Sequence, residues 1–159
     1  MGVTFDDLFV AEYRRVVGLA AVLTGRGPVA EELAQEAFIR AYRHWDRIVE
    51  YDDPAAWVRR VVVNLSTSSL RRAGSEARAL ARVALRREPV TELHLDDPSF
   101  WAAVRALPRR QAQCIALHYL EDRAAGDIAE VLGIAEATVR VHLHAGRAAL
   151  AATLEEELT

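Results

Sequence analysis

The chain has 159 residues, of which 52% are hydrophobic, and its formal net charge is −3 at pH 7. This length fits one ordinary domain or two small ones, and the apolar content suffices for a packed core, which argues against wholesale disorder. The negative charge argues against a protein that holds DNA tightly on its own, because such binding depends on neutralised phosphates. Any DNA-binding role would need a partner that supplies part of the affinity.

The cellular compartment is indicated by what the sequence lacks. The single cysteine, Cys114, cannot form an intrachain disulfide, which fits a reducing cytoplasm. The first residues show no basic region ahead of an apolar stretch, as a secretory signal would. The longest apolar run, residues 16–23, is much shorter than the roughly 20 residues that span a bilayer. We expect a soluble, cytoplasmic protein that does not insert into a membrane.

Two helices are predicted in the first part of the chain. Thr4 and Asp7 form a capping-box pattern ahead of apolar residues at helical spacing. Glycines in residues 25–27 break this helix, and Pro28 stands where a first-turn proline opens the next. The second helix carries an apolar stripe that begins at Ala30.

A third helix and a linker are predicted to follow. The helix begins at Pro54, directly after a capping aspartate, and we expect it to end near Arg72, because the Ala-Gly-Ser sequence at 73–75 is typical of a break. Residues 88–97 show no clear period and are acidic at their end, which indicates a linker.

The last part of the chain predicts four further helices. Pro98 follows a capping aspartate, Pro108 opens the next helix, and Gly133 separates the last two. No segment shows the sustained alternation of a strand. We therefore predict an all-α fold with an N-terminal helical domain over residues 1–72, a linker over 73–97 and a C-terminal helical domain over 98–159.

The C-terminal domain contains a helix-turn-helix pattern between residues 122 and 150. Ile128 and Leu132 form the inner face of a short helix, and Gly133 provides the tight turn, because glycine readily adopts left-handed dihedral angles. Val139 and Leu143 then form the inner face of a second helix, which such motifs lay in the major groove of DNA. The alternative is an ordinary pair of packed core helices.

The outer face of that second helix is poor in long hydrogen-bond donors. Arg140 and Arg147 can read guanine or hold phosphate, and Val141 can contact a thymine methyl group. Solvated surface explains each arginine equally well, and it also explains His142 and His144.

One face of the third helix combines an aromatic ring, an amide and guanidinium groups. Such side chains suit unstacked bases, because rings stack, amides read base edges and arginines neutralise phosphate. Taken alone, Trp57 is better explained by core packing. The alternatives for the others are a capping or bridging role for Asn64 and a helix C-terminus for Arg71 and Arg72.

These motifs resemble the extracytoplasmic-function (ECF) sigma factors, small promoter-specificity subunits of bacterial RNA polymerase. The resemblance covers roughly 130 of the 159 residues with motif order intact, which is worth more than any single motif. Its C-terminal segments are residues 107–111 (LPRRQ), 117–122 (LHYLED), 128–134 (IAEVLGI) and 138–150 (TVRVHLHAGRAAL). Its N-terminal segments are residues 30–41 (AEELAQEAFIRA) and the helix that carries Trp57, Arg60 and Asn64.

The resemblance implies three binding surfaces. The surface for the clamp coiled coil of core RNA polymerase comprises Glu32, Gln35, Glu36, Ile39 and Arg43. The surface that opens and reads the minus-ten region, preceded by a base-capturing loop at residues 46–53, comprises Tyr51, Trp57, Arg60, Asn64, Arg71 and Arg72. The surface that reads the minus-thirty-five element comprises Ala137, Thr138, Arg140, Val141, His144 and Arg147.

Further partners follow from the same resemblance. The C-terminal domain would touch the polymerase flap, the linker would pass near the RNA exit path, and an anti-sigma factor would control the protein. No cofactor and no catalytic residue are implied. Four positions depart from the family pattern: Glu32 and Ser68 stand where aspartate is common, and His142 and Ala145 where basic residues are common. The departures at His142 and Ala145 bear on the strength of minus-thirty-five binding, and the one at Ser68 bears on local contacts near the minus-ten region.

Two other classes of protein compete with this interpretation. A stand-alone helix-turn-helix regulator normally has a basic surface, but the segment from Phe100 onward has six arginines against eight acidic residues. A zinc site would use Cys114 and His118, one helical turn apart, with His142 and His144. This site is disfavoured, because a free cysteine is usually a small buried hydrophobe. The sequence also shows no evident carboxylate that would hydrogen-bond to metal-binding histidines.

Overall fold

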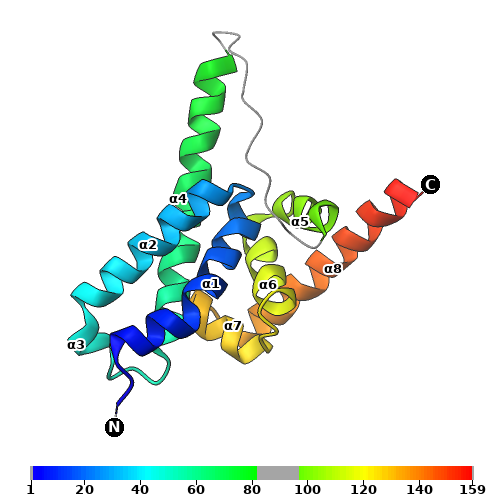
Figure 1. Ribbon diagram of the computed structural model, residues 1–159. Helices are drawn as coiled ribbons and strands as arrows, with labels where there is room; N and C mark the ends of the chain where they lie inside the picture. The colour runs from blue at the N-terminus through cyan, green and yellow to red at the C-terminus, as the bar shows by residue number, and fades with distance from the viewer. Residues whose placement is uncertain (1, 82–96, 159) are drawn as a thin grey trace.

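The structure, a computed structural model, describes residues 2–81 and 97–158, with side chains omitted for residues 77–81. The described residues form helices and no strand, which confirms the predicted all-α class (Figure 1). None of these helices is long and apolar enough to cross a bilayer. The helices are α1 (Phe5–Thr24), α2 (Gly27–Arg43), α3 (Trp45–Ile48), α4 (Pro54–Ala81), α5 (Pro98–Arg105), α6 (Arg109–Tyr119), α7 (Ala125–Leu132) and α8 (Glu136–Leu158).

Helices α1, α2 and α4 pack together, and the single turn of α3 joins α2 to the loop before α4. The predicted capping box is present, because Thr4 Oγ1 accepts from the Asp7 backbone at 3.1 Å and Asp7 Oδ2 accepts from the Thr4 backbone at 3.1 Å. Gly25 ends α1 with a φ of 73°, as a C-terminal glycine cap does. Alanines on the buried stripe of α2, such as Ala34 and Ala37, are fully buried and let α2 approach its neighbours closely.

Helix α4 differs from the prediction. It does not end near Arg72 but continues through residues 73–75 to Ala81. The predicted break was wrong because one glycine is tolerated inside a helix, and the residues around Gly74 include strong helix formers. The C-terminal end of α4 stands clear of the other helices in Figure 1. Most of the predicted linker, residues 82–96, lies outside the described residues.

Helices α5, α7 and α8 pack around α6, which is largely buried. Asp97 caps α5 by accepting from the Phe100 backbone at 3.1 Å, as its position before Pro98 predicted. Gly133 adopts a φ of 68° between α7 and α8, which confirms the predicted turn. Gly146 on α8 faces α6 so closely that a Cβ atom there would lie 2.9 Å from Cγ1 of Ile115.

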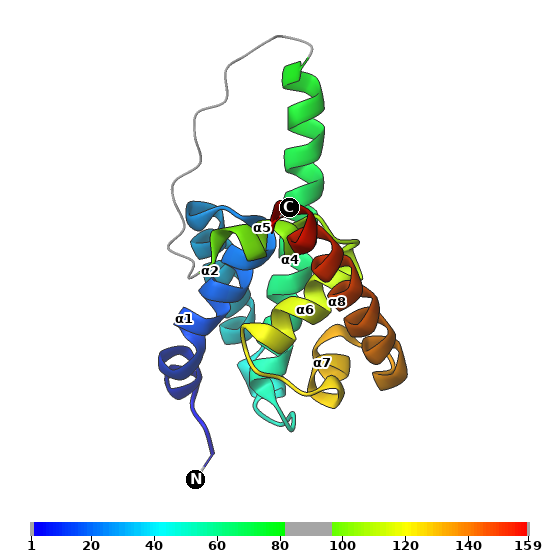
Figure 2. The same ribbon diagram turned by 90° about the vertical axis from the view of Figure 1, so that its right-hand side faces the viewer.

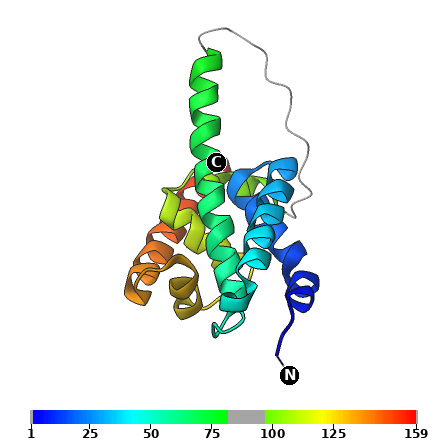
Figure 3. The same ribbon diagram turned by 90° about the vertical axis from the view of Figure 1, so that its left-hand side faces the viewer.

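The two groups of helices contact each other. Helix α6 lies between α1 and α8 (Figure 2), and α4 lies between α2 and α7 (Figure 3). The residues predicted on α4 and α8 therefore belong to one packed body, with α7 directly against α4.

Two glycine substitutions test the turn and the corrected helix. Gly133→Ala is expected to lower the free energy of unfolding by about 1–2 kcal/mol, because an L-residue is strained at this positive φ. Gly74→Ala is expected to raise it by about 0.5–1 kcal/mol, because the added methyl meets no atom within 4 Å and alanine favours a helix. Urea unfolding measures both. A neutral or destabilising Gly74→Ala would contradict a continuous helix.

Candidate nucleic-acid interface

The predicted minus-thirty-five surface forms one exposed face of α8. Val139, Leu143, Gly146 and Leu150 are buried against the rest of the domain. All six predicted residues are exposed: Ala137, Thr138, Arg140, Val141, His144 and Arg147. Ala137, Val141 and His144 lie opposite the buried stripe, and the other three flank it. This is the geometry of a recognition helix, and the contact of these residues with DNA stays a prediction.

Arg147 is held in place by two residues of α6. Its Nε donates to Tyr119 Oη at 2.8 Å, and its guanidinium lies over the Tyr119 ring, 5.7 Å from the centroid. Its Nη2 lies 3.1 Å from His118 Nε2, and His118 Nδ1 lies 2.9 Å from the carbonyl oxygen of Arg123. An imidazole that faces a guanidinium on Nε2 must accept there, so Nδ1 carries the proton and donates to Arg123. His118 and Tyr119 thus position Arg147.

Sequence reasoning missed this role of His118 and Tyr119. It considered His118 only as a possible zinc ligand, whereas both ring nitrogens are engaged with arginine groups. The separation in sequence between residues 117–122 and Arg147 is informative only when α6 and α8 are known to pack against each other. Arg140 is not purely solvated either, since it forms an ion pair with Glu136 one turn earlier.

The predicted minus-ten residues lie along α4 and the loop before it. Tyr51, Asp53, Trp57 and Arg60 line a hollow of about 320 Å³, so the predicted base-capturing loop and α4 do meet. Trp57 is half-buried and packs against the core, which agrees with the core-packing alternative, and its stacking on a base stays a prediction. The acidic Glu130 of α7 also lines this hollow, and sequence reasoning did not predict it.

The remaining minus-ten residues follow α4 toward its C-terminal half. Asn64, Arg71 and Arg72 are exposed, and Arg71 and Arg72 lie within the helix rather than at its end. The helix-end explanation for these arginines is therefore wrong. Ser68, one of the departures, donates to the Asn64 carbonyl at 3.2 Å within its own helix.

Arg60 is engaged by the second domain. Its Nε donates to the carbonyl oxygen of Val131 at 3.0 Å, and its Nη2 donates to that of Glu130 at 2.5 Å. These carbonyls belong to the last turn of α7, where unpaired carbonyl groups and the negative end of the helix dipole favour a cation. A candidate DNA contact is thus occupied by protein in this conformation.

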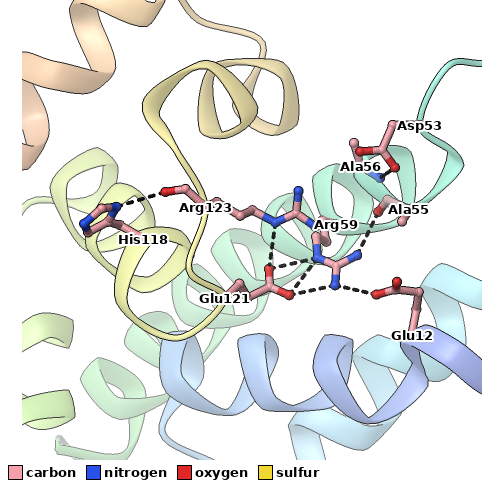
Figure 4. Close-up of polar contacts among 8 residues, drawn as sticks. All are labelled: Glu12, Asp53, Ala55, Ala56, Arg59, His118, Glu121 and Arg123. Atoms are coloured by element: carbon pink, nitrogen blue, oxygen red, sulfur yellow. Dashed lines mark hydrogen bonds and ion pairs between the residues drawn. The ribbon is translucent and has the colours of Figure 1, made fainter.

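Arg59, the residue before it, is the centre of a buried ion-pair network between the domains (Figure 4). Its side chain is 1% exposed, and it donates to Glu121 through Nε at 2.8 Å and to Glu12 through Nη2 at 2.6 Å. Burial lowers the pKa of Arg59, but hydrogen bonds and charge from Glu121 and Glu12 outweigh burial and raise the pKa above its usual value. Arg123 adds a contact to Glu121 at 3.5 Å.

The predicted polymerase surface lies along the outer side of α2. Glu32, Gln35, Ile39 and Arg43 are exposed, and Glu36 is half-buried and pairs with Arg40 at 3.0 Å. Ile39 is 45% exposed among these polar groups. Tyr42, one turn along, is also largely exposed, so Ile39 is not an isolated exposed apolar residue on this side of α2. Tyr42 was not among the predicted residues.

Cys114 is fully buried on α6 and does not have the character of a metal ligand or nucleophile. Burial raises the pKa of its thiol to about 11, so the reactive thiolate is scarce at neutral pH. Iodoacetamide at pH 8 is expected to alkylate the folded protein at least about 100-fold more slowly than the urea-unfolded chain. Mass spectrometry follows the reaction. Equal rates in the two states would contradict the burial.

Comparisons with known proteins agree with these features. Family models match for Sigma-70 region 2 over residues 8–76 and for Sigma-70, region 4 over residues 99–150. The ECF RNA polymerase sigma factor SigW of Bacillus subtilis is 27% identical in an alignment 168 residues long, gaps included, which covers 96% of this chain and 89% of that protein. The RNA polymerase sigma-E factor of Streptomyces avermitilis is 30% identical over 132 residues, which cover 79% of this chain and 71% of that protein.

A solved structure shares the fold. The sigma factor RpoE in complex with the anti-sigma factor NepR from Bartonella quintana matches with a TM-score of 0.77 at 21% identity, over 95% of this chain and 96% of that chain. CnrH in complex with the cytosolic domain of CnrY matches with a TM-score of 0.68 at 21% identity, over 96% of this chain and 88% of that chain.

A chain whose described residues are all-α, matched in order by both sigma-70 regions, is a promoter-recognition factor of the sigma-70 class. Within that class, the chain belongs to the ECF family of RNA polymerase sigma factors. It is a regulator of transcription rather than an enzyme, and it directs core RNA polymerase to promoter DNA. The stand-alone regulator is not favoured.

Proposed function

We propose that the three surfaces divide the work of promoter recognition. The exposed side of α2, centred on Ile39, binds the clamp coiled coil of core polymerase. Helix α4 and the loop before it open and read the minus-ten region, and α8 holds the minus-thirty-five element while its domain touches the flap. The observation that carries this proposal is that the predicted residues on α2 and α8 are largely exposed beside a buried stripe of the same helix, while Tyr51, Trp57 and Arg60 line one hollow.

The hollow before α4 supports base capture. Tyr51 and Trp57 both line a space of about 320 Å³, and stacking of a base on an aromatic ring is worth about 1–3 kcal/mol. Arg60 at its rim would neutralise a phosphate once it is released from the carbonyl groups of α7. Promoter binding therefore requires α7 to move away from α4.

Weak contacts with DNA suit a subunit that binds promoters only as part of RNA polymerase. The chain is net acidic, and the outer face of α8 offers few long donors. When polymerase holds the protein, the second DNA contact becomes intramolecular, and a high effective concentration replaces intrinsic affinity. Residues 1–72 and 98–159 would act as the two DNA-contacting units, with the residues between them as the connection.

Regulation and location belong to the same proposal. One structural relative, RpoE, is described in complex with the anti-sigma factor NepR, and we expect a partner of this kind for this chain. A cytoplasmic location is consistent with a partner that is core polymerase.

Run-off transcription with purified core polymerase and candidate promoters tests the proposal. We expect a product only when the protein, core enzyme and a cognate promoter are all present. Start-site mapping then identifies the minus-ten and minus-thirty-five elements. Specific, tight binding to duplex promoter DNA without core polymerase would instead support a stand-alone regulator and overturn the division of labour.

A further inference from the structure

Two adjoining hollows lie at the boundary of the two domains, between α4 and the start of α6. Their volumes are about 290 Å³ and about 250 Å³, and Thr67, Arg71, Arg109 and Gln113 line both of them. Because they share these residues, they form one cleft, called here the interdomain cleft. Small-molecule sites in proteins have volumes of about 300–1,000 Å³, so the cleft reaches the lower part of that range.

Arginines dominate this cleft. Arg71 comes from α4, and Arg105, Arg109 and Arg110 come from α5 and α6. Among the described residues that line either hollow, none is acidic. The ion pairs within the described ranges involve other arginines, so no carboxylate there neutralises these four.

Arg105 gives the clearest sign of an unmet charge. It is half-buried, and it donates to the Val22 carbonyl at 3.3 Å rather than to a carboxylate. Burial lowers the pKa of its guanidinium, because the charged form is partly desolvated. Arg105 therefore adds a positive charge, with no carboxylate partner among the described residues, to the larger hollow.

The floor of the cleft is ordered by a buried polar side chain. Gln113 is 4% exposed, and its Oε1 accepts from Arg110 Nη1 at 3.0 Å. Its Nε2 donates to Thr67 Oγ1 on α4 at 3.3 Å. Gln113 thus fixes one arginine of the cleft and ties the two domains together beneath it.

The larger hollow adds an apolar wall beside the charges. Its apolar lining comes from Leu23, Leu70, Leu107 and Ala112. The phosphate backbone of a nucleic-acid strand needs only the arginines. A molecule with a phosphate group at one end and a flat, weakly polar ring at the other would use both parts of the cleft.

We propose that the interdomain cleft binds a nucleoside polyphosphate, with the phosphates on Arg71, Arg109 and Arg110 and the base against the apolar wall. Because the ligand would contact both domains, it stabilises their packed arrangement by mass action. The proposal does not rest on promoter recognition, since its test contains neither polymerase nor promoter.

Titration calorimetry and thermal unfolding of the full chain with GTP test the proposal. We expect saturable binding at or below about 1 mM and a rise in the unfolding midpoint. Arg109→Ala removes an exposed arginine of the cleft, so the fold should persist while GTP affinity drops about 10-fold, as expected for a lost charge-assisted hydrogen bond. Arg15→Ala, an exposed arginine of α1, is the matched control and should bind GTP as the unaltered chain does.

Four outcomes would overturn the proposal. They are no binding of GTP at 1 mM, the same loss in Arg15→Ala, equal affinity for inorganic pyrophosphate, and tighter binding of a single-stranded DNA oligonucleotide that Arg109→Ala abolishes. Equal affinity for pyrophosphate would show that the base adds nothing to binding. The oligonucleotide result would show that the arginines bind DNA. If Arg109→Ala unfolds, Arg109→Gln keeps a polar side chain of similar length and takes its place.

Discussion

Replacing Glu121 by alanine is expected to lower the free energy of unfolding by about 3 kcal/mol, the lower end of the cost of orphaning a buried charge. Glu121 accepts from Arg59 through both carboxylate oxygens at 2.8 Å, and Arg59 is 1% exposed. Glu12 remains as a second acceptor at 2.6 Å, which is why the cost does not reach the upper end.

The chain has one way to rehydrate Arg59 without unfolding, which is to separate the domains. Glu12 and Arg59 belong to α1 and α4, whereas Glu121 follows α6. We therefore expect Glu121→Ala to raise the radius of gyration measured by small-angle scattering, as well as to lower the urea midpoint. Separation would also free Arg60 from the carbonyl groups of α7.

Two further variants isolate the buried charge as the cause. Glu136→Ala breaks an exposed ion pair on α8 and is expected to cost no more than about 0.5 kcal/mol. Replacing Arg59 and Glu121 together by leucine removes both charges, and such apolar replacements are often neutral or stabilising. The double variant should therefore be more stable than Glu121→Ala. A Glu121→Ala variant with unchanged midpoint and unchanged radius would contradict the role of the network.

The sequence predicted the helices well where a local signal marks their ends. Thr4, Gly25 and Gly133 each act on backbone groups close to them in sequence, so these helix ends can be predicted without the tertiary structure. The end of α4 was wrong for the converse reason. An Ala-Gly-Ser sequence can occur in both a helix and a loop, so these three residues alone do not determine whether the helix continues.

The network between the domains left no such signal. Arg59 lies 47 positions from Glu12 and 62 from Glu121, and nothing in the sequence pairs these residues. The partners of Arg60 are backbone carbonyl oxygens, which every residue carries. The resemblance to a family could suggest which surfaces meet DNA and polymerase, but it could not reveal that α7 covers part of one of them.

Ile39→Asp is expected to weaken binding to core polymerase by at least about 30-fold, which corresponds to the 2 kcal/mol or more of an interface hot spot. Ile39 is 45% exposed on α2, so a charge there leaves the core of the domain intact. It would, however, place a desolvated carboxylate in the proposed contact with the clamp. Fluorescence anisotropy with labelled protein and purified core enzyme measures the affinity.

Val141→Asp provides the reciprocal control, because Val141 is likewise an apolar residue exposed on a helix, 65% on α8. It should keep its affinity for core polymerase but reduce run-off transcription from a promoter that depends on the minus-thirty-five element, since the new carboxylate faces DNA phosphates. Raising the concentration of core enzyme should restore promoter use by Ile39→Asp and should not restore it for Val141→Asp. If both variants bind polymerase normally, the α2 surface is not the polymerase contact, and the assignment of the two helices to separate partners fails.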